Sequence, residues 1–312
     1  MIVLITGGAG FIGSHLCKRL VKDGHQVVAI DNLSNGSIQN LEVLENNPQF
    51  TFYEFDVNNT MRLRGVFDKY PFDMVFHLAA NADVSKGEES PSLDFDNTFQ
   101  STLSVLEMMR VYKIKKFFFA SSSTVYGNTN ERLQEHCSIM RPISHYGAAK
   151  LACEAFVSSY SSLYGFRVWI ARFCNAVGPN MTHGVIPDLI RKLKSHPEKL
   201  EVFGDGTQTK PYIWIDDLIE GVICLISKAN NDYNSYLVGV DSNVSVEKIA
   251  QIVMDEVGLH VPIHYGGRYS GWKGDVRQYR YDVSQLRLMG WTPKYSAEEA
   301  VRKAVQVNMN NL

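Results

Sequence analysis

Residues 1–31, MIVLITGGAGFIGSHLCKRLVKDGHQVVAID, predict a strand, a glycine-rich loop, a helix and a second strand in direct succession. The apolar run at residues 2–5 is typical of a buried parallel strand, and residues 26–30 form a second such run. Between them, apolar side chains recur at the spacing of one helix face. This succession predicts a strand–helix–strand unit at the start of an α/β fold.

The loop between the first strand and the helix, TGGAGFIG at residues 6–13, has the glycine spacing of a dinucleotide-binding loop. Glycine permits positive φ and lets a ligand approach the backbone, and the helix start presents unpaired N–H groups to a pyrophosphate. The alternative is a glycine-rich turn without a ligand, which the strand-to-helix context disfavours. We therefore expect the cofactor to contact Gly7, Gly10, Phe11, Ile12 and Gly13.

Asp31 ends the second strand about 20 residues beyond the loop, where a carboxylate can accept hydrogen bonds from a ribose 2′-OH. The same negative charge would repel a 2′-phosphate, and the sequence has no arginine within several residues of Asp31. The expected cofactor is therefore NAD rather than NADP.

The composition narrows the class of protein. The chain has 312 residues, a formal net charge of -2 and five cysteines. Such a charge gives no electrostatic reason to expect nucleic acid or a membrane surface as a partner. The cysteines are scattered without C-x-x-C spacing, so we expect neither a disulfide framework nor a metal site. With no apolar run of about 18 residues and no signal-like start, the sequence predicts a cytoplasmic enzyme.

Further strand-like runs at residues 50–54, 74–78, 116–120 and 168–173 alternate with helical patterns. This alternation predicts a Rossmann-type doubly wound parallel sheet, in which ligands bind at the carboxyl ends of the strands. His77, at the end of one predicted strand, is expected to fix the adjoining loop by hydrogen bonding rather than to act in catalysis.

The character of the chain changes after residue 175, where the segments become shorter and richer in aromatic residues and glycine. We expect an NAD-binding domain over residues 1–175, with a return at about 210–243. Residues 176–312 are expected to form mainly a smaller α/β lobe that binds the substrate.

Tyr146 and Lys150 are four residues apart, so on a helix they share one face. A free tyrosine has a pKa of about 10 and is a poor base at neutral pH. A nearby ammonium ion favours the phenolate, which could then take a proton from a hydroxyl while a hydride leaves its carbon. An isolated Tyr-x-x-x-Lys is common on exposed helix faces. Here it indicates a catalytic pair because a dinucleotide loop and a serine-rich strand end precede it.

In this order the motifs resemble those of the extended short-chain dehydrogenases/reductases, and within them the NAD-dependent nucleotide-sugar epimerases and dehydratases of the UDP-glucose 4-epimerase type. The resemblance covers nearly the whole chain. It rests on TGGAGFIGSHL at 6–16, DNLSNG at 31–36, HLAANADV at 77–84, SSSTVYG at 121–127, YGAAK at 146–150, RFCNAVGP at 172–179, GDGTQTKPYIWIDD at 204–217 and GWKGDVRQYRYD at 271–282.

The resemblance implies roles for individual residues. Tyr146 would be the catalytic base, Lys150 its modulator and a ligand of the nicotinamide ribose, and Ser122 the hydroxyl that bonds the reacting sugar oxygen. The other implied cofactor ligands are Asn32, Asp56, Val57, Ala79, Ala80 and Asn97. The implied ligands of the nucleotide-sugar substrate are Asn81, Thr124, Asn175, Lys210, Arg268 and Asp275.

The same resemblance disfavours one reaction of the family and does not decide between two others. The 4,6-dehydratases of this type have an Asp-Glu pair before Val-Tyr-Gly, whereas this chain has Ser123 and Thr124, so dehydration is disfavoured. Lys210-Pro211 stands where the epimerases usually have Arg-Asp, and Ala82 stands where one branch has lysine. The sequence therefore does not identify the nucleotide or the sugar.

The expected reaction is epimerisation at C4 through a 4-keto sugar. A 4-dehydrogenase that releases the ketone, for example of a GDP-linked heptose, and a non-catalytic NAD-binding protein are the alternatives.

Two helices, expected around residues 92–112 and 144–164, are rich in apolar residues. In relatives such helices pair between subunits, so the resemblance implies a homodimer or homotetramer.

Overall fold

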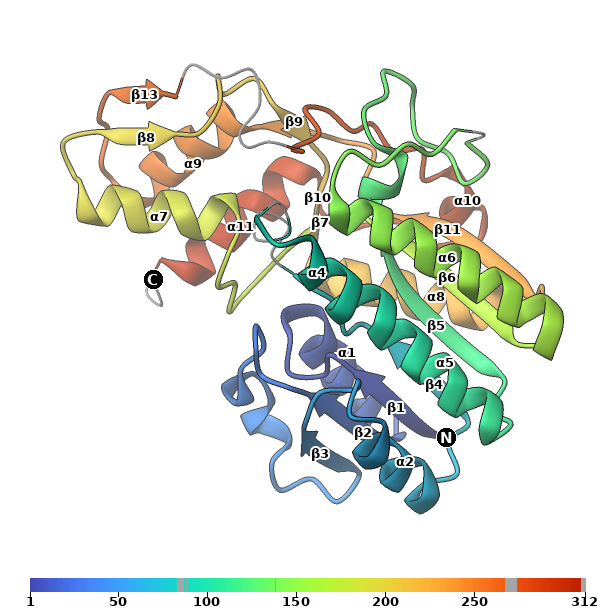
Figure 1. The fold of residues 1–312 in the computed structure, drawn as a ribbon. Coiled ribbons are helices and arrows are strands. Elements are labelled where there is room, and N and C mark those ends of the chain that lie inside the picture. Colours follow the sequence, from blue (N-terminus) through green and yellow to red (C-terminus); the bar gives the residue numbers. More distant parts are fainter. Residues whose placement is uncertain (83–86, 88, 138, 267–273, 310–312) are drawn as a thin grey trace. The chain divides into compact units, whose positions relative to one another are not determined.

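The computed structural model describes residues 1–82, 87, 89–137, 139–266 and 274–309 (Figure 1). The chain forms two compact units and passes between them several times. Unit 1 comprises Met1–Val125, His145–Arg172 and Leu225–Tyr236, and unit 2 comprises Tyr126–Ser144, Phe173–Cys224 and Leu237–Leu312.

Unit 1 is built on the seven-stranded sheet, whose strand order is β11-β6-β5-β4-β1-β2-β3. Four neighbouring pairs of strands, β1 with β2, β1 with β4, β2 with β3, and β4 with β5, run parallel. The order reverses at β1, which is the switch point of a doubly wound fold. The strands are β1 (Ile2–Thr6), β2 (Gln26–Asp31), β3 (Phe50–Glu54), β4 (Met74–His77), β5 (Lys116–Ser122), β6 (Arg167–Phe173) and β11 (Tyr233–Val238).

The helices of unit 1 bury apolar faces against this sheet. Alternate strand residues, such as Val28 with Ile30 and Phe117 with Phe119, share one core with apolar residues of α2, α5 and α6. Figure 1 shows α5 and α6 running side by side over the sheet. The helices are α1 (Phe11–Lys22), η1 (Ile38–Leu44), α2 (Thr60–Lys69), α4 (Pro91–Asp94), η2 (Phe95–Gln100), α5 (Ser101–Val111), η3 (Ser123–Tyr126), α6 (His145–Tyr164) and α8 (Ile215–Lys228), of which η3 and α8 cross the boundary between the units.

The helical run from residue 91 to residue 111 contains a π-helical segment, η2, between α4 and α5. A π-helical turn displaces the following side chains relative to an α-helix and is frequent at functional sites. The apolar pattern predicts the helix correctly, but it does not indicate the π segment.

Unit 2 combines short strands in pairs with amphipathic helices. Parallel pairs join β10 to β7 and β13 to β8, and an antiparallel pair joins β12 to β9. Helices α7, α9 and α11 pack on one another. The strands are β7 (Asn175–Val177), β8 (Leu200–Val202), β9 (Thr209–Lys210), β10 (Tyr212–Trp214), β12 (Val244–Ser245) and β13 (Ile263–Tyr265), and the helices are α7 (Val185–Ser195), α9 (Val246–Val257), α10 (Ser284–Leu288) and α11 (Ala297–Asn308).

The prediction of a Rossmann-type parallel sheet is confirmed, and each strand predicted in the first 173 residues is present within two residues of its expected bounds. Within the described part of the chain, no helix has the length and apolar character needed to cross a membrane.

Candidate functional site

The glycine loop lies at the carboxyl end of β1 and leads directly into α1. Gly7 has a φ of +71°, and a Cβ at Gly13 would lie 2.0 Å from the carbonyl oxygen of Gly7. The backbone therefore requires glycine at both positions. At the helix start, Gly10 is the N-cap, and among the described residues no side chain caps the helix and no acid lies in its first turn. The N–H groups of Phe11, Ile12 and Gly13 thus begin a helix whose positive end suits an anion.

Asp31 lies against this loop from the end of β2. Its Oδ2 accepts a hydrogen bond from Ala9 N at 3.0 Å, and its Oδ1 accepts one from Leu33 N at 2.8 Å. Burial raises the pKa of Asp31, and the backbone hydrogen bonds oppose that effect. An ionised carboxylate has about four acceptor positions, so these contacts orient the group and leave capacity for a hydroxyl ligand.

The next predicted cofactor residues follow β2, β3 and β4. Asn32 Nδ2 donates to Asp56 Oδ2 at 2.8 Å, which joins two of them. Val57 is 5% exposed beside them, while Ala79 and Ala80 are partly exposed after β4. These residues and the glycine loop all follow carboxyl ends of parallel strands, as predicted for a ligand of this fold.

His77 is fully buried, and its ring contacts a strand and a helix rather than the adjoining loop that it was expected to fix. Its Nδ1 lies 2.7 Å from Thr6 Oγ1, and its Nε2 lies 3.0 Å from Thr102 Oγ1. Burial, and secondarily the charge of Lys150, lowers its pKa to about 3, so the ring is neutral. His77 therefore ties β1 to α5 beneath the loops.

Asn97 and Asn81 lie on adjoining segments. Asn97 is a partly exposed residue of η2. Asn81 is 4% exposed; its backbone N donates to Thr98 Oγ1 at 3.1 Å, and its Nδ2 donates to Asp94 Oδ1 at 2.9 Å. The predicted substrate ligand Asn81 thus has its amide held by Asp94, a residue that the sequence analysis did not select.

Ser122 and Tyr146 are brought together by β5 and α6. The oxygen of Ser122 accepts hydrogen bonds from Thr124 N at 3.2 Å and from Thr124 Oγ1 at 3.0 Å. A hydroxyl has two acceptor positions and one donor, so the proton of Ser122 remains available. It is directed to Tyr146, whose pKa is lowered by a hydrogen bond with Ser122 but raised by loss of hydration, the larger effect, to about 12.

Lys150 is 2% exposed and lies one helical turn beyond Tyr146. Its Nζ donates to the carbonyl oxygen of Ala120 at 2.7 Å, and lies 5.8 Å from the centre of the Tyr146 ring and 4.8 Å from that of Phe119. Burial lowers the pKa of Lys150 to about 8, although neighbouring acidic groups oppose this. The site therefore holds an ammonium ion that is close to losing its proton at neutral pH.

A buried ion pair supports the Ser122–Tyr146–Lys150 group. Arg172 on β6 bonds Glu154 on α6 through two nitrogens, Nη2–Oε2 at 2.7 Å and Nε–Oε1 at 3.0 Å. Ser121, next to Ser122, donates to Glu154 Oε1 at 2.5 Å. This network joins β5, β6 and α6 directly behind the candidate catalytic side chains.

The predicted substrate residues of unit 2 form a second group. Asn175 and Tyr212 are partners in the register of β7 and β10, and their side chains are hydrogen-bonded. Lys210 forms a salt bridge with Asp275, which is 6% exposed. Burial, and secondarily the charge of Asp275, raises the pKa of Tyr212. The sequence analysis missed Tyr212 and the Lys210–Asp275 pairing. Arg268 lies outside the described residues.

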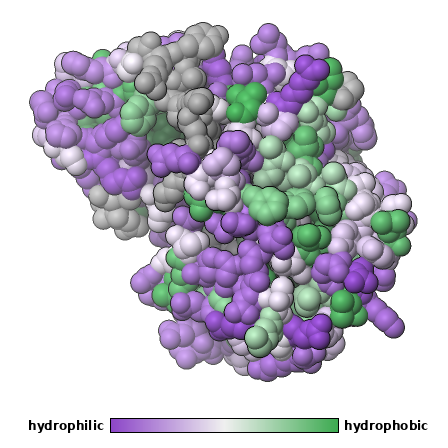
Figure 2. All heavy atoms as spheres, viewed as in Figure 1, coloured by the Kyte–Doolittle hydropathy of each residue, from purple (hydrophilic) through white to green (hydrophobic). Residues whose placement is uncertain are grey.

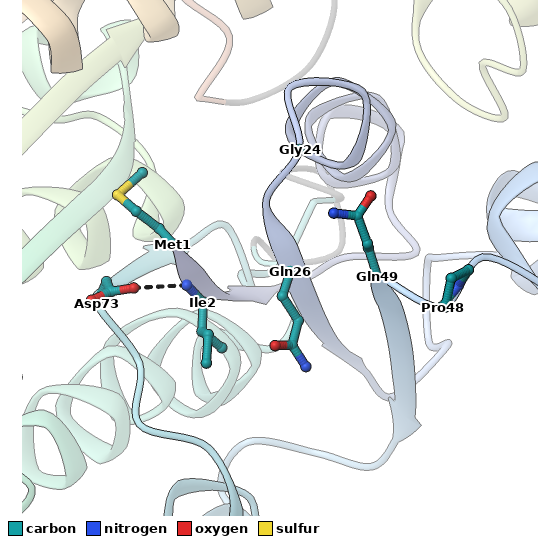
Figure 3. A pocket seen from close by; sticks show the side chains of 7 residues that line it. All are labelled: Met1, Ile2, Gly24, Gln26, Pro48, Gln49 and Asp73. Atoms are coloured by element: carbon teal, nitrogen blue, oxygen red, sulfur yellow. Dashed lines mark hydrogen bonds between the residues drawn. The ribbon is translucent and has the colours of Figure 1, made fainter.

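One pocket of about 500 Å³ lies at the opposite edge of the sheet (Figure 3). Its lining includes Met1, Gln26 and Gln49, at the amino ends of β1, β2 and β3. Asp73 in its lining accepts a hydrogen bond from the backbone N of Ile2 at 2.7 Å. None of the predicted site residues that the structure describes lines this depression, so it is not the candidate site.

Comparisons with known proteins agree with this geometry. The NAD dependent epimerase/dehydratase family matches residues 3–239. A putative UDP-glucose 4-epimerase of Methanocaldococcus jannaschii is 31% identical, over 99% of each chain. The crystal structure of a UDP-galactose 4-epimerase is 35% identical with a TM-score of 0.89 over 100% of both chains. The structure of UDP-glucuronic acid 4-epimerase from Bacillus cereus, in complex with UDP-glucuronic acid and NAD, is 28% identical with a TM-score of 0.90 over 100% of both chains.

Proposed function

Because this chain belongs to the NAD dependent epimerase/dehydratase family, we propose that it is a 4-epimerase of a nucleotide-diphosphate sugar. NAD dependence is common to the family, and the structures most similar to this one include enzymes complexed with NAD. The observation that carries the proposal is the Ser122–Tyr146–Lys150 group beside a glycine loop, with Ser123 and Thr124 in place of a dehydratase acid and base.

The chain's own residues fit NAD. The uncapped start of α1 would hold the pyrophosphate, and Asp31 the adenosine ribose. Asn32, Asp56 and Val57 would line the adenine end. Ala79, Ala80 and Asn97 would lie along the cofactor, and Tyr146 and Lys150 at its nicotinamide ribose. When bound there, NAD supplies the acceptor and donor for the hydride of the sugar C4.

The catalytic side chains handle the proton of the C4 hydroxyl. Ser122, whose acceptor positions are both occupied by Thr124, would turn its O–H from Tyr146 to the C4 oxygen of the bound sugar, where negative charge develops. Tyr146 takes the hydroxyl proton as general base, and Lys150 stabilises its phenolate form. After the 4-keto sugar has rotated, return of the hydride to the opposite face of C4 would leave a negative oxygen, and Tyr146 would give its proton back to that oxygen. The same residues therefore serve both halves of the epimerisation.

We propose Asn81, Thr124, Asn175 and Lys210 as ligands of the substrate, with Arg268 as a further ligand of the phosphates or nucleoside. Lys210 is held by Asp275, so a phosphate would be bound by an oriented ammonium ion rather than by a bidentate guanidinium. Asp275 itself could accept a bond from a ribose hydroxyl.

The test is incubation with UDP-, GDP-, CDP- and dTDP-linked sugars, observed by proton NMR at C4 and by absorbance of reduced nicotinamide. Inversion at C4 without net NADH formation supports the proposal. Net NADH with a released 4-keto sugar would instead identify a dehydrogenase, the second candidate. A Tyr146→Phe variant removes only the phenol oxygen, and undiminished turnover in that variant would contradict the assignment of the base.

We also propose that the chain is a homo-oligomer that pairs through η2, α5 and α6. Figure 2 shows hydrophobic residues gathered where these helices lie. Phe95 is 54% exposed, Phe156 41% and Leu163 71%, and Phe99 packs edge-on against Phe156 with ring centres 5.0 Å apart. Apolar residues grouped on one face in this way are typical of an interface between subunits.

A further inference from the structure

Asp94 is a buried carboxylate that the proposed chemistry does not use. It ends α4 directly before η2, and it is 1% exposed. Its Oδ1 accepts a hydrogen bond from Asn81 Nδ2 at 2.9 Å. Its Oδ2 is buried and has no hydrogen-bond partner in the described part of the protein. One oxygen of the carboxylate therefore lies in the interior without a donor, which is costly for a charged group.

The surroundings hold this carboxylate in place. A Cβ at Gly87 would lie 2.0 Å from Asp94 Oδ2, so the backbone of residue 87 closes the space beside the oxygen. Asn81, the donor to the other oxygen, is itself bonded through its backbone N to Thr98 Oγ1 at 3.1 Å. Asp94 is thus fixed on both sides and keeps its charge at one position.

Helix α4, which ends at Asp94, and the following η2 both pack on α6, the helix that carries Tyr146 and Lys150. The titratable groups that face Asp94 therefore lie mainly on α6. Burial raises the pKa of Asp94, and the Asn81 bond and the positive charges of His145 and Lys150 lower it. In return, the charge of Asp94 raises the pKa of both Tyr146 and Lys150. His77 on β4 also faces Lys150 but is neutral.

Other acidic groups near Lys150 differ from Asp94 in their pairing. The charge of Glu154 also raises the pKa of Lys150, but its carboxylate is paired with Arg172 through two hydrogen bonds. Cys153 is a thiol whose pKa is raised by burial, so it is uncharged at neutral pH. No salt bridge joins Asp94 to a cation within the described residues, so no ion pair with any of them weakens the effect of its charge on Lys150.

We propose, on the basis of the function proposed above, that Asp94 is a positioning residue. It places a fixed negative charge beside the Tyr146–Lys150 pair, keeps Lys150 in its ammonium form, and sets the pH at which Tyr146 becomes the base. It does so without touching the reacting atoms.

The sign of its effect on a pH–rate profile follows directly. In the holoenzyme the positive nicotinamide ring would favour the Tyr146 phenolate, so the acid limb would report ionisation of Tyr146 and the alkaline limb loss of the proton from Lys150. A nearby negative charge raises the pKa of both Tyr146 and Lys150. Removing that charge therefore moves both limbs of the profile to lower pH. We expect Asp94→Asn and Asp94→Ser to shift both limbs by about one pH unit, the size of effect produced by a single nearby charge. Asp96→Asn removes an exposed charge two residues away and is expected to move neither limb.

Two variants are used because they separate charge from shape. Asn fills the space of Asp94 and Ser does not, so the two can differ in kcat and in stability, yet a charge effect predicts the same shift of the limbs in both. A lower kcat with unmoved limbs in both variants would overturn the proposal and leave Asp94 a purely structural residue.

A second measurement does not depend on turnover. Protein labelled with ¹³Cζ-tyrosine is titrated by NMR in the holoenzyme, and the Tyr146 signal is assigned by its loss in Tyr146→Phe. The midpoint for Tyr146 is expected to fall in Asp94→Asn and Asp94→Ser but not in Asp96→Asn. An unchanged midpoint refutes the role of Asp94, whereas a lowered midpoint in a protein that turns over no nucleotide sugar refutes only the proposed function.

Discussion

Replacing Arg172 by methionine tests whether the buried ion pair holds the catalytic strand and helix together. Both partners are 4% exposed, and the variant would leave the Glu154 carboxylate with Ser121 as its only bonded neighbour from this network. Removing one member of a buried pair costs roughly 3–5 kcal/mol, because the remaining charge is desolvated without compensation. Methionine fills much of the arginine stem, so the cost arises from charge rather than from a cavity.

The assay is equilibrium unfolding in urea, followed by far-UV circular dichroism, for four proteins that form a double-mutant cycle. We expect Arg172→Met and Glu154→Leu each to lose about 3–5 kcal/mol, and the double variant to lose much less than the sum, because no unpaired charge remains. Arg287→Met is the matched surface control. Its 2.8 Å bond to Asp241 lies between side chains that are 44% and 32% exposed, and the expected loss is about 0–1 kcal/mol. A loss below about 1 kcal/mol in Arg172→Met would refute the argument that unpaired buried charge dominates here.

Three further predictions concern the cofactor loop and the apolar face. Gly13→Ala should weaken NAD binding at least tenfold in calorimetry, because the new methyl group would lie 2.0 Å from a backbone oxygen. Gly65→Ala is the control, because a Cβ there has no neighbour within 4 Å. It should stabilise α2 by roughly 0.5–1 kcal/mol in thermal unfolding. Asp31→Ser should reduce the ratio of NAD to NADP affinity measured by calorimetry, because it removes the charge that repels a 2′-phosphate, and an unchanged ratio would contradict this role. Phe156→Lys should lower the molar mass in light scattering at micromolar concentration by placing a charge in the proposed interface, and an already monomeric parent protein would contradict the oligomer.

The parts of the fold predicted from sequence are those encoded by neighbouring residues. The βαβ unit at residues 1–31 needs only an apolar run, a glycine spacing and a helical pattern, all in immediate succession. Tyr146 and Lys150 are likewise related by one helical turn, so their proximity follows from local geometry alone.

The parts that were not predicted depend on contacts between distant residues. Lys210 and Asp275 are 65 residues apart, and nothing in either motif indicates their salt bridge. The segment at 126–144 follows the catalytic strand but folds into unit 2, where Leu133 N donates to the carbonyl oxygen of Arg280 at 2.7 Å. Asp94 has no sequence signal of its own, because its burial depends on the π-helical turn and on Gly87.

Helix α6 explains why the proposed catalytic group can be predicted from sequence, whereas the residues proposed to set its ionisation cannot. Tyr146, Lys150 and Glu154 recur every four residues, so one helix face carries the proposed base, its cation and the support for Ser121. Their charges are balanced from elsewhere: Arg172 on β6 neutralises Glu154, and the Asp94 carboxylate on α4 faces Lys150. A helix pattern thus specifies which groups meet, whereas the ionisation of those groups is set by side chains that only the folded sheet brings to the helix.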